Sequence, residues 1–505
     1  MKNNTHPPYL IGIDIGTSST KSVIIDCMGQ VLTWKDKEYP ISSPKPDWAE
    51  QDPDLWLAAT IQTLHDVIQE SAINPNQIAG ISLGGQMHGL VCLDDDGKVL
   101  RPAIIWADRR SKSQLEQLQS DFGIDRLAQW TGNPLATGFM LPSWVWLVEN
   151  EPDVARATRL LLLPKDYVRF RLTGLAGAEP SDASSTLLFD PHQRSWCRPL
   201  LQEIGLSYDY LPPISESASI SGGLLPEIAS ACGLLEGTPV IFGGSDVSLQ
   251  ALGQGIIDPG TVSCTIGTGG QIFAPISQPV HDPELRLHLF CHAIPERWHL
   301  ESAILSAGLA LRWLRDRFWM DQSYASLADS AQKAEAATQG IFFLPYLAGE
   351  RTPIMDSSAR AAFLGLSYEH GQAHIVRAVM EGVVFAMRQG LELMHSLGVS
   401  NEHLIATGAS IRHPLWLQLQ ANIYNCPIYP ASTPQATGVG AALLAGIGSG
   451  VFKDYQTAIH ILAPTLNQSI LPEPARVDSY EKAYRTYCEI YPNIRIFNPL
   501  TRPES

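Results

Sequence analysis

Residues 10–25 read LIGIDIGTSSTKSVII, and residues 262–273 read VSCTIGTGGQIF. Both stretches place a Gly-Thr turn between two apolar runs, which is the pattern of a β-hairpin. Glycine lets the backbone turn tightly and approach an anion closely, and the N–H groups of such a turn, with nearby Thr and Ser hydroxyls, donate hydrogen bonds to phosphate oxygens. We therefore predict two phosphate-binding hairpins, one in each half of a duplicated molecule.

The first turn also has some features of a P-loop, because residues 16–22 read GTSSTKS. A P-loop requires glycine directly before the lysine and a helix after the motif. Here Thr20 precedes Lys21 and a β-branched run follows, so we exclude that motif. A lone Gly-Thr turn is more often an ordinary hairpin. The pairing of two turns favours phosphate binding, as does the carboxylate of Asp14 at the end of a predicted strand, where a metal carried by phosphates would lie.

Composition narrows the class of protein. The chain has 505 residues, of which 45% are hydrophobic and 17% charged, and its formal net charge is −16. This is an ordinary globular composition, and the length predicts about two or three domains. No basic cluster interrupts the negative charge, which argues against nucleic acids and anionic membranes as partners. We expect a cytoplasmic protein with reduced cysteines, because no segment resembles a signal peptide or membrane span and no Cys-x-x-Cys pair occurs.

Strand and helix patterns alternate along the chain, which indicates an α/β fold. A turn at residues 258–260 precedes the second hairpin, so we place a domain boundary near residue 255 and expect domains 1–255 and 256–505. The expected elements are hairpin strands over 10–34, a helix from Asp52-Pro53, a buried strand at 78–83, and a helix at about 374–397. A Gly/Ala-rich segment at 438–448 is too short and too small-sided to cross a bilayer.

A candidate substrate loop follows the predicted strand at 78–83. Residues 84–89 read GGQMHG, so their side chains lie at the carboxyl end of a strand, where α/β proteins bind ligands. Gln86, Met87 and His88 together offer donors and acceptors that suit a polyhydroxyl substrate. An isolated loop histidine is more often only structural.

Asp246 ends the segment Gly243-Gly244-Ser245-Asp246, a glycine turn expected after a short buried strand. Its carboxylate is placed to accept a proton from a hydroxyl group, while the alternative is a helix N-cap. The run Trp106-Ala107-Asp108-Arg109-Arg110 suits sugar contact through Asp108, or equally a surface salt bridge. Asp94-Asp95-Asp96-Gly97 is expected to be a solvated hairpin turn rather than a metal cluster. At residues 407–410, TGAS, small residues would let a purine ring lie against the backbone, although close packing is the alternative.

These segments together resemble the FGGY family of carbohydrate kinases, and they occur in the family's order over nearly the whole chain. The matching segments are residues 12–18 (GIDIGTS), 85–89 (GQMHG), 163–167 (LPKDY), 243–246 (GGSD), 266–270 (IGTGG) and 343–353 (FLPYLAGERTP). A further family signature lies at residues 361–366 (AAFLGL), completed by His374-Ile375 and residues 378–381 (AVME).

The resemblance implies an actin-like ATPase fold, with two ribonuclease-H-like domains around a central cleft where MgATP and a sugar meet. It implies that Asp14 positions Mg²⁺ and that Asp246 is the catalytic base. The expected phosphate-binding residues are Gly16, Thr17, Ser18, Gly267 and Thr268, and those near adenine are Gly408 and Ala409. The expected sugar contacts are Gln86, Met87, His88 and Asp108.

The implied reaction is ATP-dependent conversion of D-xylulose to D-xylulose 5-phosphate, with gluconate or ribulose as the alternative. Val247 stands where xylulose-specific members usually carry Asn, Ser143 stands where the family signature has Lys, and TGAS at residues 407–410 replaces a run of three glycines. A non-catalytic actin-like protein would keep the hairpins but would have no use for Met87-His88 or Asp246. The implied partners are the sugar and MgATP, and the sequence leaves a homodimer open.

Overall fold

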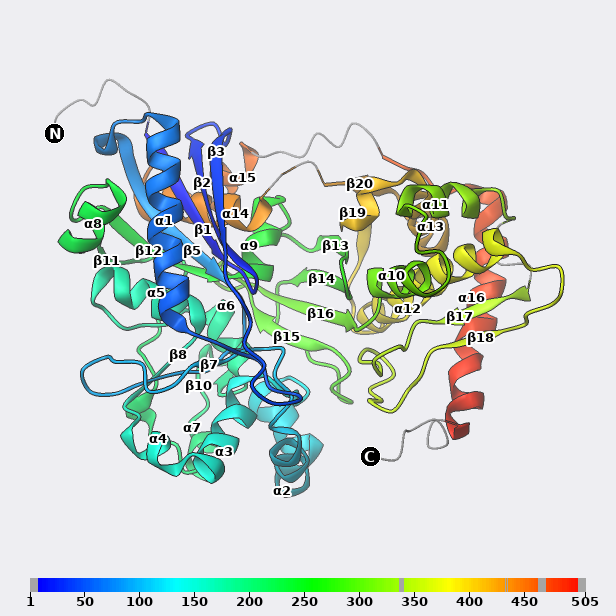
Figure 1. Cartoon of the computed structure of the whole chain (residues 1–505), viewed down its shortest axis with the longest axis horizontal. Coiled ribbons are helices and arrows are strands. Elements are labelled where there is room, and N and C mark those ends of the chain that lie inside the picture. The colour runs from blue at the N-terminus through cyan, green and yellow to red at the C-terminus, as the bar shows by residue number, and fades with distance from the viewer. Residues whose placement is uncertain (1–7, 336–339, 432, 434, 462–468, 498–505) are drawn as a thin grey trace. The chain divides into compact units, whose positions relative to one another are not determined.

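The computed structural model describes residues 8–335, 340–431, 433, 435–461 and 469–497 (Figure 1). Contacts group the chain into two compact units. Unit 1 comprises Met1–Ile257, Leu289–Trp298 and Thr433–Pro464, and unit 2 comprises Asp258–His288, His299–Ser432 and Thr465–Ser505. The first long run of unit 1 ends close to the boundary expected near residue 255, and two later segments of the chain also belong to that unit.

Unit 1 is built on a six-stranded sheet. In spatial order its strands are β11 (Ile220–Gly223), β12 (Pro239–Ser245), β5 (Ile78–Gly85), β1 (Tyr9–Ile15), β2 (Ser19–Asp26) and β3 (Val31–Glu38). β1, β2 and β3 form an antiparallel meander, whereas β5 is parallel to both β1 and β12. The predicted hairpin strands over residues 10–34 and the predicted strand at 78–83 are confirmed.

Unit 2 repeats this arrangement in the second six-stranded sheet. Its strands in unit 2 are, in spatial order, β16 (Trp298–Ile304), β14 (Gly270–Ile276), β13 (Gly260–Ile266), β19 (Asn401–Gly408) and β20 (Ile428–Pro430). β15 (His288–Cys291) falls, except for His288, in the segment Leu289–Trp298 that belongs to unit 1. β13 is antiparallel to β14 and parallel to β19, which is parallel to β20. The order β14-β13-β19-β20 therefore matches β2-β1-β5-β12, and the predicted half-to-half repeat is present in an α/β fold with a sheet in each half.

The sheet of unit 1 has a hydrophobic core on each face. Side chains alternate between the two faces of a strand, so β1 contributes residues to both cores. From β1, Ile11, Ile13 and Ile15 pack into one core with Trp56 of α1 (Pro53–Ser71). Leu10 instead packs into a second core that contains α9 (Asp246–Gly253) and α14 (Ala436–Gly448). Asp52 caps α1 by accepting a hydrogen bond from the backbone N–H of Asp54, so the helix predicted from Asp52-Pro53 is confirmed.

The Gly/Ala-rich segment forms α14, which packs against β1 and α9 with its backbone very close to theirs. A Cβ on Gly12 would lie 1.8 Å from the carbonyl oxygen of Gly438, and a Cβ on Gly440 would lie 2.0 Å from that of Leu249. The small residues therefore serve close approach of backbones, and this packing explains why α14 belongs to unit 1. Among the described helices, none combines the length and apolar character needed to cross a membrane.

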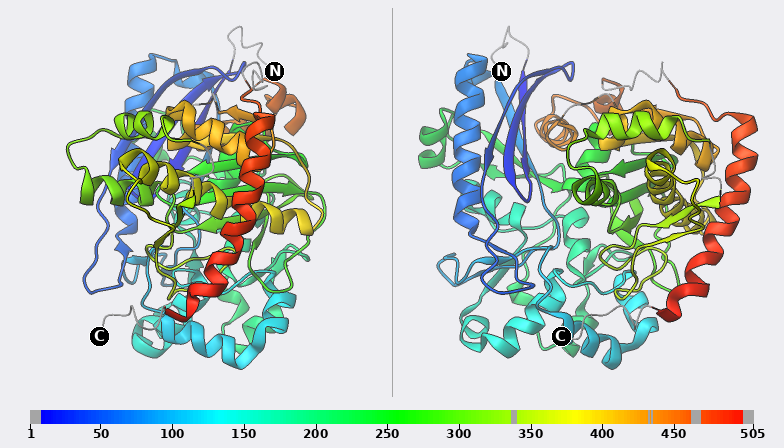
Figure 2. Two further views of the ribbon diagram at one scale, coloured as in Figure 1. Left: turned by 90° about the vertical axis from the view of Figure 1, so that its right-hand side faces the viewer. Right: turned by 45° about the vertical axis from the view of Figure 1, so that its right-hand side comes forward.

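Figure 1 labels the remaining elements, and Figure 2 shows them from two further sides. In unit 2, α12 (Gln372–Ser396) confirms the helix predicted at about 374–397, and α16 (Pro474–Ile494) packs on it and on α13 (Pro414–Tyr424). The other helices are α2 (Lys112–Thr131), α3 (Met140–Asn150), α4 (Pro152–Ala157), α5 (Pro164–Thr173), α6 (Pro180–Ala183), α7 (Arg198–Glu203), α8 (Pro226–Cys232), α10 (Gly308–Phe318), α11 (Tyr324–Gln332) and α15 (Tyr455–His460). The paired short strands are β4 (Glu50–Gln51) with β7 (Ala103–Ile104), β6 (Val91–Leu93) with β8 (Leu160–Leu162), β9 (Phe189–Asp190) with β10 (Ser195–Trp196), and β17 (Phe342–Leu344) with β18 (Ala362–Leu364).

Two expectations about turns have different outcomes. The hairpin turn at Asp94-Asp95-Asp96-Gly97 is confirmed, because the Asp94 carboxylate accepts hydrogen bonds from the backbone of Asp96 and Lys98. The glycine turn expected at Gly243-Gly244 is wrong, because both residues continue β12 through an irregular register. Gly243 has φ +86°, and a Cβ there would lie 1.8 Å from the carbonyl oxygen of Leu83. Glycine is needed there for close approach of β12 to β5, not for a turn.

We expect Gly440→Ala to destabilise unit 1 by about 1 to 3 kcal/mol, because the added methyl group forces α14 away from α9. The free energy of unfolding, measured by urea denaturation, tests this. Gly371→Ala is the control, since its Cβ would meet nothing within 4 Å and its φ is −99°. An equal loss in the two variants would contradict the close-packing account.

Candidate active site

The carboxyl ends of three strands lie next to one another in unit 1. Asp14 of β1 is opposite Gly84 of β5, and Gly85 is opposite Ser245 of β12. Gln86 directly follows β5 and Asp246 directly follows β12. The strand register therefore brings Asp14, Gln86 and Asp246 to the same edge of the sheet.

The first Gly-Thr turn is held in shape by three side chains from elsewhere in unit 1. The Tyr39 hydroxyl donates to the carbonyl oxygen of Gly16 at 2.5 Å, and Gln51 Nε2 donates to that of Thr17 at 2.7 Å. The half-exposed Trp106 donates from Nε1 to the Thr17 hydroxyl at 2.8 Å. No motif in the sequence marks Tyr39 or Gln51, so these supports were not predicted.

Asp14 sits beside this turn in a partly buried position. Burial raises the pKa of its carboxyl to about 6, while the neighbouring positive charge of Lys21 on β2 lowers it. Among the described residues, no group of three or more His, Cys, Asp and Glu side chains is arranged to hold a metal ion. A single carboxylate beside a phosphate loop nevertheless suits Mg²⁺, which keeps several waters and binds through one or two carboxylates plus phosphate oxygens.

Gln86 is buried, and its contacts connect the sugar loop to the first hairpin. Its backbone N–H donates to the carbonyl oxygen of Ile15 at 2.8 Å, and its Nε2 donates to Gln51 Oε1 at 2.9 Å. Gln51 in turn supports Thr17. These contacts give Gln86 a structural role, and its predicted contact with the sugar stays a prediction.

Met87 and His88 form a strained turn after β5. Met87 is buried, His88 has φ +75°, and the backbone N–H of Gly89 donates to the carbonyl oxygen of Met87 at 2.9 Å. This three-residue turn with positive central φ is rare, and such strain is found most often at functional sites. His88 Nδ1 lies 2.8 Å from the carbonyl oxygen of Ser185, and its ring stacks on Phe139 with centroids 3.7 Å apart. A carbonyl only accepts, so Nδ1 carries the proton and neutral His88 has an acceptor at Nε2.

Asp246 is the first residue of α9 and is partly buried. The N-cap position belongs to Ser245, whose side chain accepts from the backbone N–H of Ser248, so the N-cap alternative for Asp246 is wrong. One Asp246 carboxylate oxygen accepts from the backbone N–H of Val247 at 2.8 Å. A helix N-terminus stabilises negative charge, which favours the ionised form that a base requires.

Asp108 is buried and its carboxylate is used structurally. It accepts from the backbone of Ala49 at 2.6 Å and of Arg110 at 2.9 Å, and both its oxygens accept from the Arg110 guanidinium. Arg110 lies over the ring of Trp48, 3.6 Å from its centroid. The ion pair expected at the surface is therefore buried, and contact between Asp108 and a sugar stays a prediction.

Unit 2 holds the second Gly-Thr turn in the corresponding place. The carbonyl oxygens of Gly267 and Thr268 accept hydrogen bonds from the backbone N–H groups of Gly308 and Leu309, at 2.8 and 3.0 Å. Gly408 is opposite Ile266 at the end of the neighbouring parallel strand. It has φ +74°, and a Cβ there would lie 2.5 Å from the carbonyl oxygen of Ile266. Ala409 follows as the first residue of a 3₁₀ turn, Ala409–Arg412.

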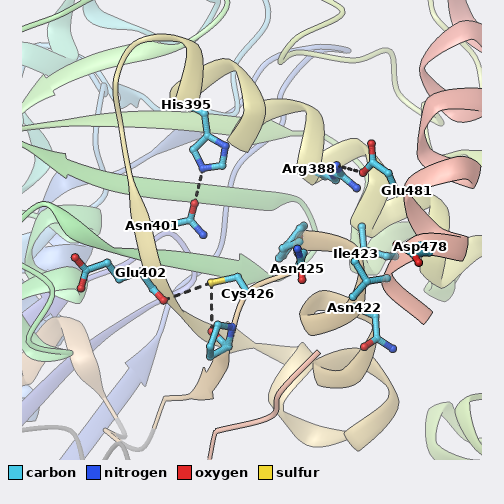
Figure 3. Close-up of a pocket in the computed structure, with 13 residues that line it drawn as sticks. Arg388, His395, Asn401, Glu402, Asn422, Ile423, Asn425, Cys426, Asp478 and Glu481 are labelled. Atoms are coloured by element: carbon cyan, nitrogen blue, oxygen red, sulfur yellow. Dashed lines mark hydrogen bonds and ion pairs between the residues drawn. The ribbon is translucent and has the colours of Figure 1, made fainter. Parts of the chain in front are cut away.

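A separate cavity of about 560 Å³ lies in unit 2 (Figure 3). It is lined by residues of the α12, α13 and α16 region, including an ion pair in which Arg388 lies 2.6 Å from Glu481. None of the residues predicted for the site lines this cavity. This cavity therefore lies apart from the strand ends at which the predicted residues gather.

The repeated sheets define a protein with the actin-like ATPase fold. The family model for the N-terminal domain of FGGY carbohydrate kinases matches residues 9–253, and the model for the C-terminal domain matches residues 262–449. The chain belongs to the FGGY family of carbohydrate kinases and is a phosphotransferase that acts on an alcohol group. The resemblance expected from the motifs is confirmed.

Particular relatives refine this comparison. A xylulose kinase from Bacillus subtilis is 36% identical over 490 residues, which cover 97% of this chain and 98% of that protein. A gluconokinase from the same organism is 28% identical over 498 residues, covering 96% and 95%. The solved structure of a ligand-bound xylulose kinase from Lactobacillus acidophilus has a TM-score of 0.93 and 28% identity, covering 98% of this chain and 100% of that one.

We expect Gly408→Ala to weaken ADP binding at least tenfold, because the methyl group would collide with Ile266 beside the second Gly-Thr turn. Isothermal titration calorimetry measures this affinity. Gly398→Ala is the matched control, since Gly398 also has positive φ, +88°, but a Cβ there would meet nothing within 4 Å. Equal ADP affinity in Gly408→Ala and the wild type would remove Gly408 from the nucleotide site.

Proposed function

We propose that this kinase transfers the γ-phosphoryl group of ATP to D-xylulose, giving D-xylulose 5-phosphate. The observation that carries the choice of sugar is the 36% identity, over nearly the full length of both chains, to a protein named xylulose kinase. The gluconokinase of the same organism is 28% identical. Gluconate is therefore the weaker alternative.

Asp246 is the proposed general base. Its carboxylate accepts the proton of the attacking sugar hydroxyl as the new O–P bond forms and ADP leaves. Phosphoryl transfer depends mainly on positioning and on stabilisation of charge, so no covalent intermediate on the protein is required. The place of Asp246 beside Asp14 and the sugar loop, set by the register of β12, β5 and β1, supports this role.

The remaining groups bind and orient the substrates. His88 Nε2 accepts a hydrogen bond from a sugar hydroxyl, in the tautomer that its contact with Ser185 favours. The turns at Gly16-Thr17-Ser18 and Gly267-Thr268 donate hydrogen bonds to phosphate oxygens, and Gly408-Ala409 lies near adenine. Asp14 would hold Mg²⁺, which when bound offsets the negative charge of the phosphates.

Asp246→Asn should lower kcat by about 10²- to 10⁴-fold, because the amide cannot accept the proton of the attacking hydroxyl. Its affinity for MgATP should stay close to that of the wild type, since the phosphate turns are unchanged. A coupled ADP-release assay and calorimetry measure the two quantities. Turnover close to that of the wild type in folded Asp246→Asn would exclude this residue as the base.

The substrate assignment is tested by kcat/KM for D-xylulose, D-ribulose and D-gluconate in the same assay, with D-xylulose expected to be highest. Val247→Asn should lower the KM for D-xylulose severalfold, because an added hydrogen bond contributes about 1 kcal/mol. Val247→Leu is the control and should not lower it. Efficient use of gluconate with no use of D-xylulose would overturn the choice of sugar and leave the kinase class intact.

A further inference from the structure

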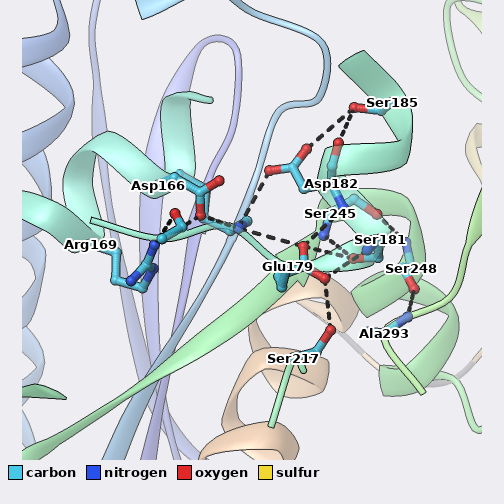
Figure 4. A network of polar contacts seen from close by, with 12 residues as sticks. Asp166, Arg169, Glu179, Ser181, Asp182, Ser185, Ser217, Ser245, Ser248 and Ala293 are labelled. Carbon is cyan, nitrogen blue, oxygen red and sulfur yellow. Dashed lines mark hydrogen bonds and ion pairs between the residues drawn. The ribbon is translucent and has the colours of Figure 1, made fainter. Parts of the chain in front are cut away.

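A buried segment of unit 1, Glu179–Thr186, contacts both Ser245, which precedes Asp246, and His88 of the sugar loop. Figure 4 shows the polar contacts of this segment around Glu179, Ser181 and Asp182. We call it the serine segment, because it reads EPSDASST. It forms α6 and the 3₁₀ turn Ser184–Thr186, and its polar side chains are 0% exposed. Buried polar side chains are costly unless their hydrogen bonds are made, so the contacts of this segment indicate what it holds in place.

At its first end, the serine segment holds the residue that precedes Asp246. The backbone N–H of Ser245 donates to Ser181 Oγ at 3.0 Å, and Ser181 Oγ donates to Glu179 Oε1 at 2.9 Å. A backbone N–H only donates, so Ser181 Oγ accepts from Ser245 and gives its own hydrogen to Glu179. These two hydrogen bonds connect the start of α9 to the Glu179 carboxylate.

Glu179 is itself firmly anchored. Its carboxylate also accepts from the backbone of Ser181 and Asp182, at 2.8 and 2.9 Å, and from the Ser217 hydroxyl at 2.7 Å. Lys165 Nζ lies 3.6 Å from it and supplies the compensating charge. Burial lowers the pKa of Lys165, but nearby carboxylates, Glu179 among them, outweigh burial and raise that pKa, so the lysine stays charged. A buried carboxylate with this many donors is a rigid anchor.

At its other end, the serine segment holds the sugar loop. The carbonyl oxygen of Ser185 accepts from His88 Nδ1 at 2.8 Å, and Ser185 Oγ accepts from the backbone N–H of His88 at 3.3 Å. Ser185 Oγ donates to the carbonyl oxygen of Asp182 at 2.7 Å. Four residues after Ser181, the same segment therefore contacts the histidine proposed to bind sugar.

We propose that the serine segment fixes the position of Asp246 relative to His88, with Ser181 and Glu179 as positioning residues for phosphoryl transfer. This inference rests on the proposed function, in which Asp246 is the base. A misplacement of about 1 Å between reacting groups costs on the order of 10²-fold in rate. Loss of Ser181 Oγ removes the acceptor of the Ser245 N–H. We expect the first turn of α9 to become more mobile as a result. None of the residues proposed to contact the substrates is changed by this substitution.

The test compares Ser181→Ala with Ser184→Ala. Ser184 is equally buried, and its hydroxyl accepts from the backbone of Cys291 at 3.0 Å and donates to the carbonyl oxygen of Ser181 at 3.2 Å. Both substitutions remove a buried serine hydroxyl from the same segment, and only Ser181→Ala removes the contact with Ser245. We expect Ser181→Ala to lower kcat by about 10- to 100-fold with the KM for D-xylulose within about threefold of wild type, and Ser184→Ala to keep kcat within about threefold. Ser181→Thr, which restores the hydroxyl, should recover most of the rate.

Amide hydrogen exchange supplies a readout that does not depend on the reaction. Exchange in a peptide containing Ser245 and Asp246 should be faster in Ser181→Ala than in the wild type, and unchanged in Ser184→Ala. If Ser181→Ala does not fold, Ser181→Cys replaces it, because a thiol is a weaker acceptor of similar shape. Unchanged exchange at Ser245, or equal loss of kcat in the Ser181 and Ser184 variants, would overturn the positioning role. Unaltered turnover in Asp246→Asn would instead overturn the proposed function.

Discussion

The parallel register of β1, β5 and β12 is the constraint on which the rest of unit 1 depends. In this register Asp14 lies level with the end of β5, and Asp246 begins the helix that follows β12. A strand slipped by one residue would turn every side chain to the opposite face. Asp246, Asp14 and the loop after β5 would then no longer lie together at one edge of the sheet, even with their side chains unchanged.

Close backbone packing maintains that register. Gly12 allows α14 to approach β1, Gly243 allows β12 to approach β5, and Gly440 allows α14 to approach α9. Interiors packed to this density do not deform gradually. α14, whose small residues allow this approach, packs against both β1 and β5, and the backbone N–H of Ser245 at the end of β12 donates to Ser181 of the serine segment.

Short sequence patterns predicted the strands, turns and helix ends that depend on neighbouring residues. The two Gly-Thr hairpins, the strand at 78–83 and the start of α1 at Asp52-Pro53 follow from turn residues, β-branched runs and capping, and each was found. The turn predicted at Gly243-Gly244 is wrong, because the need for glycine at Gly243 comes from the carbonyl oxygen of Leu83 on another strand. The order of the motifs along the chain also indicates the family.

Long-range partners could not be predicted in this way. Nothing near Gln51 in the sequence indicates that it supports Thr17, and nothing near Glu179 indicates that it anchors the start of α9 through Ser181. Asp108 was expected to contact a sugar or, equally, to form a surface salt bridge, and it forms a buried salt bridge with Arg110 two residues away. Its hydrogen bond with Ala49, like those of Gln51 with Thr17 and of Ser181 with Ser245, joins residues far apart in the sequence, and a single sequence carries no local pattern for such contacts.

The strand ends of unit 1 are proposed to form the sugar site, and a crystal structure of the protein with D-xylulose and a non-hydrolysable ATP analogue with Mg²⁺ would show whether they do. We expect the C5 hydroxyl oxygen of the sugar within about 3 Å of an Asp246 carboxylate oxygen, and another sugar hydroxyl donating to His88 Nε2. D-Xylulose bound away from both Asp246 and His88 would contradict this proposal.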